Sequence, residues 1–217
     1  MVTEVPVESV VGNNLGADTP GGALLLASRS PRRRTLLDEG GLAHEAEHPG
    51  FDDAILEPGK VSPQQWVMSL AYLKAWAKAR DAERGRIVLG ADTTCVIDGR
   101  MVGTPRDADE AAQIIRSFVN REHDVITGVA LVEAGTGRRR LFADTATVRF
   151  GPLLNAEIDR YVASGEWSGK AGAYNLSERL NAGWPITFRG DPSTIMGLPM
   201  KRLARELAAF RAARTAN

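Results

Sequence analysis

The sequence has little cysteine, no net charge and no long apolar run. A single cysteine, Cys95, in 217 residues excludes an intramolecular disulfide and fits a reducing compartment, so we expect a cytoplasmic protein. Lysine plus arginine and aspartate plus glutamate both number 27, and this balance gives no reason to expect a nucleic-acid or membrane partner. No apolar run is long enough to span a bilayer.

Residues 1–21 lack a basic start followed by an apolar region, so they are not a secretory signal. We expect them to form a flexible N-terminal extension. Residues 22–217 are enough for a single domain of two lobes with a substantial hydrophobic core.

Positive charge is concentrated in one place, directly after the short apolar run 24–27. Ser28 and Ser30 flank an arginine, and Pro31 precedes three more arginines, 32–34. We expect Ser30 to be a helix N-cap and Pro31 the first helical residue. Cations in a first helical turn are unfavourable unless an anion lies between them and the backbone N–H groups. The pattern predicts a phosphate site; the alternatives are a solvated basic helix end and a Ser-Arg tract of the RNA-associated kind.

A lysine interrupts the apolar face of the next expected helix. The capping box at residues 62–65 begins this helix, which we expect to reach about Glu83. Its apolar residues fall on one stripe: Trp66, Val67, Leu70, Leu73 and Ala77. Lys74 lies inside that stripe. It either extends to solvent at the rim of the packing face or reaches a bound anion.

An aspartate stands in the middle of an apolar strand pattern. Residues 86–97 predict a strand interrupted at Gly90-Ala91-Asp92, and Asp98-Gly99 predicts a hairpin. A carboxylate there is costly unless it is hydrogen-bonded, paired with a cation or bound to a metal. Asp92 is therefore the strongest candidate for chemistry; the alternative is an aspartate that caps a neighbouring loop.

The remaining segments complete an α/β pattern. Residues 44–60 contain no convincing periodicity and are expected to be irregular. We expect a helix capped by Asp107, strands at 124–133 and 139–150, a helix at 155–163, a strand near 185–188 and a terminal helix from Pro199. Together these elements predict a mixed β-sheet flanked by helices, with two lobes around a cleft.

Several short motifs occur together and in order. They are Leu26-Ala27-Ser28-Arg29-Ser30-Pro31-Arg32-Arg33, Asp52-Asp53, Leu70-Ala71-Tyr72-Leu73-Lys74-Ala75, Gly90-Ala91-Asp92-Thr93, His123 to Val129, Lys170 to Tyr174, and Gly190-Asp191 with Gly197-Leu198-Pro199. This series resembles the Maf family of nucleoside triphosphate pyrophosphatases over about residues 23–210. The resemblance implies a strongly curved mixed sheet related to that of the inosine triphosphate pyrophosphatases.

The resemblance also implies an activity. It is the hydrolysis of a nucleoside triphosphate, either a dTTP/UTP-like pyrimidine or a modified nucleotide, to the monophosphate and pyrophosphate. Such an enzyme would use Mg²⁺ or Mn²⁺, clean the nucleotide pool and form a homodimer. The implied triphosphate ligands are Ser28, Ser30, Arg32 and Arg33. Arg33 and Thr93 match the dTTP/UTP branch of the family rather than the methylated-GTP branch.

The implied chemistry is centred on two acidic positions and one lysine. Asp92 would bind the metal or orient and deprotonate the attacking water. Asp53 matches a second acidic position near the metal, where a glutamate is usual. Lys74 would add charge stabilisation.

Two departures from the family pattern bear on activity and substrate choice. Thr104 stands where the family has a phosphate-contacting lysine, and we hypothesise that Arg106 or Arg100 substitutes for it. The segment Leu176-Ser177-Glu178 replaces an Ile-Gln-Gly signature linked to base recognition. The alternative function is therefore a nucleotide-binding regulatory protein with reduced or lost catalysis. A nucleic-acid binder acting through the 29–34 arginines is the third hypothesis.

Overall fold

The computed structural model describes residues 22–50 and 56–213. The predicted extension 1–21 and the predicted ligand Asp53 lie outside the described residues. Within that part of the chain, no helix combines the length and the apolar character needed to cross a membrane.

The described residues form a seven-stranded mixed sheet flanked by helices, which confirms the predicted fold class. The strand order is β2-β1-β3-β5-β6-β7, with β4 paired to β3. The strands are β1 (Leu24–Ala27), β2 (His44–Glu47), β3 (Ile87–Ile97), β4 (Arg100–Val102), β5 (Glu122–Glu133), β6 (Arg139–Phe150) and β7 (Ile186–Arg189). Strand β1 runs parallel to β2 and β3, and the other pairings are antiparallel.

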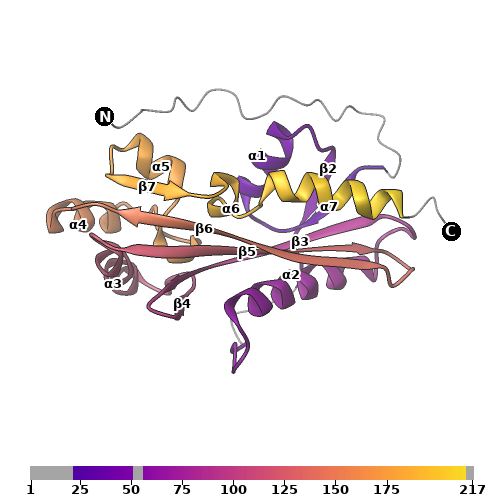
Figure 1. Cartoon of the computed structure of the whole chain (residues 1–217), viewed down its shortest axis with the longest axis horizontal. Coiled ribbons are helices and arrows are strands. Elements are labelled where there is room, and N and C mark those ends of the chain that lie inside the picture. The colour runs from indigo at the N-terminus through magenta and orange to yellow at the C-terminus, as the bar shows by residue number, and fades with distance from the viewer. Residues whose placement is uncertain (1–21, 51–55, 214–217) are drawn as a thin grey trace.

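The helices cover both sides of the long strands (Figure 1). They are α1 (Pro31–Glu39), α2 (Pro63–Ala79), α3 (Ala108–Phe118), α4 (Asn155–Ala163), the 3₁₀ helix η1 (Ala171–Ala173), α5 (Leu176–Asn181), α6 (Pro192–Ile195) and α7 (Met200–Ala212). Figure 1 shows α2 on one side of β5 and β6, with α1, α6 and α7 on the other. Strand β2 was not expected. Its residues alternate between half-buried and exposed, as is typical of a polar sheet edge, and it lacks the apolar run that predicts a core strand.

The hydrophobic core is divided between the two ends of the sheet. At one end, Leu26 and Leu89 pack with α1 and α7 on one face, and Ala71 and Ala75 of α2 cover the other. At the other end, a separate cluster gathers around Phe118 with residues of α3, α4 and α5. The predicted arrangement of two lobes around a cleft stays a prediction.

Helix α2 lies unusually close to the sheet. A Cβ atom on Gly90 of β3 would lie 2.1 Å from the carbonyl oxygen of Ala71, and one on Gly128 of β5 would lie 2.4 Å from the carbonyl carbon of Val67. Glycine at these positions therefore serves helix-to-sheet packing. Strand β3 continues through Asp92 without a break, so the predicted interruption is wrong.

One edge of β3 is open in its middle. Strand β1 pairs with β3 up to Leu89, and β4 pairs with it only from Cys95. Among the described residues no strand pairs with positions 90–94 on that edge, while β5 pairs along the whole opposite edge. We call this opening, at the carboxyl end of β1, the sheet gap. Ligands of open α/β sheets bind beyond the carboxyl ends of strands.

Candidate active site

The start of α1 closes one side of the sheet gap. Ser30 occupies the N-cap position and Pro31 the first turn, as the sequence predicts. The Ser30 side chain makes no capping hydrogen bond, and the first turn contains no acidic residue. The hydroxyl of Ser28 instead accepts from the backbone N–H of Ser30 at 3.2 Å. The positive end of the α1 dipole is therefore neither capped by Ser30 nor neutralised by a carboxylate within the turn.

Arg33 links three separate segments around this helix start. Its Nε donates to the carbonyl of Gly197 at 2.8 Å, and its two terminal nitrogens donate to the hydroxyls of Ser28 and Thr93, each at 3.2 Å. The guanidinium thus fixes α1 against β3 and the turn before α7. Phosphate contact by Ser28, Ser30 and Arg33 stays a prediction.

A directed chain of hydroxyl groups continues from Arg33 across the sheet. The Thr127 hydroxyl donates to the carbonyl of Thr194 at 2.8 Å, so it accepts from the Thr93 hydroxyl at 2.9 Å. The Thr194 hydroxyl in turn donates to Asp144 at 2.6 Å. Sequence reasoning did not connect Thr127, Thr194 and Asp144 to the site. The available signal was the cross-strand register of Thr93 with Thr127, which requires the pairing of β3 with β5.

The Lys74–Asp92 ion pair lies on the opposite face of β3. The Nζ of Lys74 is 2.6 Å from Oδ1 of Asp92, and the two side chains are only 12% and 14% exposed. Consecutive strand residues point to opposite faces, so Asp92 faces α2 whereas Thr93 faces α1. The pair explains why an aspartate stands in an apolar strand and a lysine on an apolar helix face, because each buried charge has the other as its partner. Their catalytic roles stay predictions.

Arg32 is half-buried beside the helix start. Its side chain makes no hydrogen bond or ion pair with any residue that the structure describes. Burial lowers the pKa of its guanidinium, and the nearby carboxylate of Glu178 acts in the opposite direction. A partly desolvated cation without a hydrogen-bond acceptor suits an anionic ligand.

The residues expected to replace the family lysine lie at the protein surface. Arg106 is 84% exposed, and its Nε donates to Glu110 at the start of α3 at 2.9 Å. Arg100 and Thr104 are both exposed. A pocket of about 300 Å³ lies beside this loop, lined in part by Thr104, Glu110 and Gln113. Substitution for the lysine by Arg106 or Arg100 stays a prediction.

The described residues offer too few metal ligands to bind an ion alone, so they fit only a metal that is also bound by oxygen atoms of the substrate. This part of the chain contains no group of three or more histidine, cysteine, aspartate or glutamate residues placed to bind an ion. Asp92 is a single carboxylate at the gap. Mg²⁺ is commonly bound by one or two carboxylates, with phosphate oxygens and water completing its shell. Asp92 is compatible with that mode of binding.

The fold and the site together define an α/β protein with a candidate anion site beside a buried carboxylate–lysine pair. The family model described as Maf-like protein matches residues 23–210. This chain belongs to the Maf family.

Three relatives are similar over most of their length, and each is named a dTTP/UTP pyrophosphatase. The one from Pelotomaculum thermopropionicum is 40% identical and covers 86% of this chain and 96% of its own. The one from Salinibacter ruber is 39% identical, with 86% and 90% covered. The one from Symbiobacterium thermophilum is 40% identical, with 86% and 93% covered.

Proposed function

We propose that this chain hydrolyses a nucleoside triphosphate to the nucleoside monophosphate and pyrophosphate. The observation that carries the proposal is the position of two groups at one gap in the sheet. On one side lie the α1 start and Arg32, which suit a polyphosphate. On the other lies Asp92 with Lys74, a carboxylate held in one orientation by a buried cation.

The proposed reaction follows from these charges. The triphosphate binds the first turn of α1 and Arg32, which leaves its α-phosphate toward the Asp92 side. Asp92 orients a water molecule and takes its proton as the oxygen attacks the α-phosphorus. The bond from that phosphorus to the bridging oxygen breaks, and pyrophosphate leaves. Lys74 keeps Asp92 in place and stabilises the negative charge that develops on the phosphoryl oxygens.

A divalent cation, Mg²⁺ or Mn²⁺, is part of the proposal. It would neutralise phosphate charge, and Asp92 with Asp53 are its proposed protein ligands. The names of the relatives support dTTP and UTP as first substrates. Nucleotide-pool housecleaning is proposed as the role on the family resemblance, and a cytoplasmic location on the single cysteine of the sequence. A homodimer is proposed on the family resemblance alone.

The test is an end-product assay on purified protein with Mg²⁺ and with Mn²⁺. The substrates are dTTP, UTP, CTP, methylated and isomerised pyrimidine triphosphates, 7-methyl-GTP and ITP, and the control is Asp92→Asn. Monophosphate and pyrophosphate in equal amounts, lost in the control, are expected. Release of inorganic phosphate in place of pyrophosphate would contradict the proposed bond cleavage.

One observation favours a second candidate function. Thr104 provides no cation where the family has a lysine, and Arg106 is paired with Glu110 instead. A regulatory nucleotide-binding protein would retain the phosphate site and lack efficient turnover. Nucleotide binding by calorimetry, without product in the assay above, would support this second function.

A further inference from the structure

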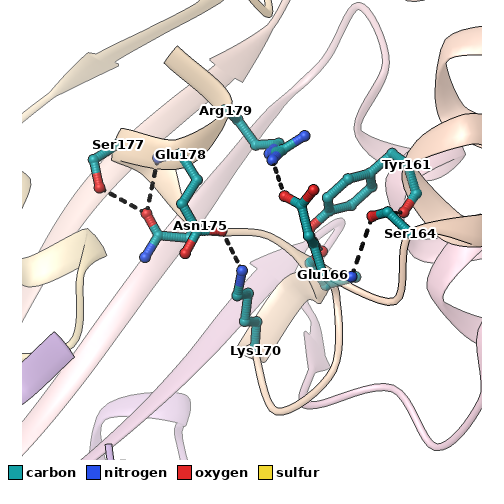
Figure 2. Close-up of polar contacts among 9 residues, drawn as sticks. Tyr161, Ser164, Glu166, Lys170, Asn175, Ser177, Glu178 and Arg179 are labelled. Atoms are coloured by element: carbon teal, nitrogen blue, oxygen red, sulfur yellow. Dashed lines mark hydrogen bonds and ion pairs between the residues drawn. The ribbon is translucent and has the colours of Figure 1, made fainter. Parts of the chain in front are cut away.

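Two ion pairs lie side by side next to α5, and they differ in their surroundings (Figure 2). Lys170 pairs with Glu178, and Arg179 pairs with Glu166. The backbone N–H of Glu178 donates to the Asn175 side chain at 3.1 Å, which fixes the first turn of α5. Each pair joins a buried cation to a more exposed carboxylate.

The Arg179–Glu166 pair belongs to the core. The guanidinium of Arg179 lies 4.3 Å from the ring centre of Tyr161 and 5.3 Å from that of Trp184. Its side chain is 9% exposed, and Glu166 covers its open side. Two aromatic rings and a single carboxylate thus enclose this guanidinium, of which the buried Nε has no hydrogen-bond partner among the described residues.

The Lys170–Glu178 pair has a different neighbour. Lys170 is nearly as buried as Arg179, at 11% exposure of its side chain, and Glu178 at 41% is about as exposed as Glu166 at 48%. Glu178 is also the leading charged neighbour of Arg32. One accessible carboxylate therefore serves two cations, and one of these has no hydrogen-bond acceptor among the described residues.

The loop that carries Lys170 packs on β3 directly beyond the sheet gap. The N–H of Gly172 donates to the carbonyl of Gly103 at 2.9 Å, and a Cβ on Gly172 would lie 2.5 Å from the Cys95 sulfur. Cys95 is two residues after Thr93 on β3, so both point to the same face. On that face Arg33 holds the start of α1. Lys170 and Glu178 thus border the proposed polyphosphate site.

We propose that Glu178 is an internal counter-anion of the polyphosphate site. Without ligand, its carboxylate pairs with Lys170 and partly neutralises Arg32. A phosphate chain displaces that carboxylate and then contacts both cations. The identity of the ligand rests on the proposed function; the competition itself does not. Displacement of the Glu178 carboxylate costs free energy, which a ligand must offset by its contacts with Lys170 and Arg32. Glu178 therefore lowers the affinity for weakly charged ligands and favours triphosphate over monophosphate.

The experiment measures binding of tripolyphosphate, which has no base or ribose, by calorimetry in metal-free buffer. Glu178→Gln is expected to bind it about five- to ten-fold more tightly than wild type. The matched control is Glu166→Gln, which removes the same charge from the neighbouring pair and is expected to stay within about two-fold of wild type. Adding Lys170→Met to Glu178→Gln is expected to abolish most of the gain.

Several outcomes would overturn the proposal. Equal tightening in both glutamine variants would mean that only overall charge matters. Unchanged or weaker binding in folded Glu178→Gln would mean that the carboxylate does not compete. If Glu178→Gln does not fold, Glu178→Asp replaces it, because the shorter side chain withdraws the carboxylate from Lys170. Tightening of at least about two-fold is then expected, and unchanged affinity would count against competition.

Failure of this inference and failure of the proposed function give different results. If wild type turns over dTTP but Glu178→Gln binds tripolyphosphate no more tightly, the inference is wrong and the function stands. If the variant binds more tightly while no triphosphate is hydrolysed, the counter-anion is supported and the pyrophosphatase proposal is wrong.

Discussion

The Nζ of Lys74 lies 2.6 Å from Oδ1 of Asp92, and this contact joins α2 to β3 beside the sheet gap. Neither charge has a solvated alternative, because both side chains are largely buried. Removal of Lys74 would leave the buried Asp92 carboxylate without this cation, and breaking a buried ion pair in this way commonly costs about 3–5 kcal/mol. The pair is thus a requirement of the fold as well as the proposed centre of the chemistry.

Loss of either member of this pair is expected to remove most of the activity. Asp92→Asn and Lys74→Met are each expected to lower kcat by about 10²–10³-fold, since one removes the base and the other its positioning cation. The double variant is expected to be no slower than the worse single variant, because the two residues act as a unit. Steady-state kinetics with dTTP measures all three.

Lys78→Met is the matched control for the lysine change. Lys78 is four residues from Lys74 on the same helix, but it pairs with Glu47 at the surface. Its loss is expected to change kcat by less than about two-fold and stability by less than about 1 kcal/mol. A similar loss of activity in Lys78→Met and Lys74→Met would indicate a general charge effect and contradict the assigned role.

Gly90→Ala tests the close approach of α2. The new methyl group would overlap the carbonyl oxygen of Ala71 at 2.1 Å, and backbone atoms must move to relieve that overlap. We expect a loss of about 3 kcal/mol in the free energy of unfolding, together with lower activity as Lys74 moves away from Asp92. Urea denaturation measures the first effect. Gly103→Ala is the control, since its Cβ would meet nothing within 4 Å; equal destabilisation in the two variants would contradict the packing argument.

The features that sequence predicted well are those decided by near neighbours. The capping box of Ser62 with Gln65 and the N-cap Asp107 involve residues three positions apart, and both are present. The prediction that Gly90 interrupts the strand was wrong. Glycine is needed there because helix α2, a separate element of the chain, packs closely against it. The sequence pattern singled out Asp92 and Lys74 separately, but their pairing depends on how α2 crosses β3.

Contacts between distant segments could not be predicted in the same way. Arg33 and Gly197 are 164 positions apart, and nothing local to either residue indicates their hydrogen bond. Likewise, Glu178 acts electrostatically on Arg32, and nothing local to either residue indicates that influence. Motif resemblance identified the segments that make the site, while the structure supplies the contacts between them.

Arg33→Lys tests whether the guanidinium fork holds the helix start. A lysine cannot donate simultaneously to Gly197, Ser28 and Thr93 in the same planar geometry. We expect a loss of about 2 kcal/mol in the free energy of unfolding and a lower kcat/KM. Arg34→Lys, at an exposed position of the same helix turn, is expected to be neutral. Unchanged stability in Arg33→Lys would mean that the three hydrogen bonds contribute little to the fold.

His123 predicts a pH dependence of stability. Its ring is buried, stacks on Phe118 with ring centres 3.8 Å apart, and shares a hydrogen bond of 2.9 Å with the Tyr174 hydroxyl. Burial lowers the pKa of His123 to about 3. In the unfolded chain the imidazole has a pKa of about 6.5 and takes up a proton first as the pH falls. The unfolded state then binds more protons, so stability falls with decreasing pH from about 6.5 downward.

The loss from His123 is expected to approach about 1.4 kcal/mol for each pH unit well below 6.5. His123→Phe retains a ring against Phe118 but cannot titrate, so it is expected to be less stable at neutral pH and to lose less stability between pH 6.5 and 5. Chemical denaturation across that interval measures both slopes, with the exposed His48→Asn as the control. An equal slope of unfolding free energy against pH in wild type and His123→Phe would show that a group other than His123 titrates over that range.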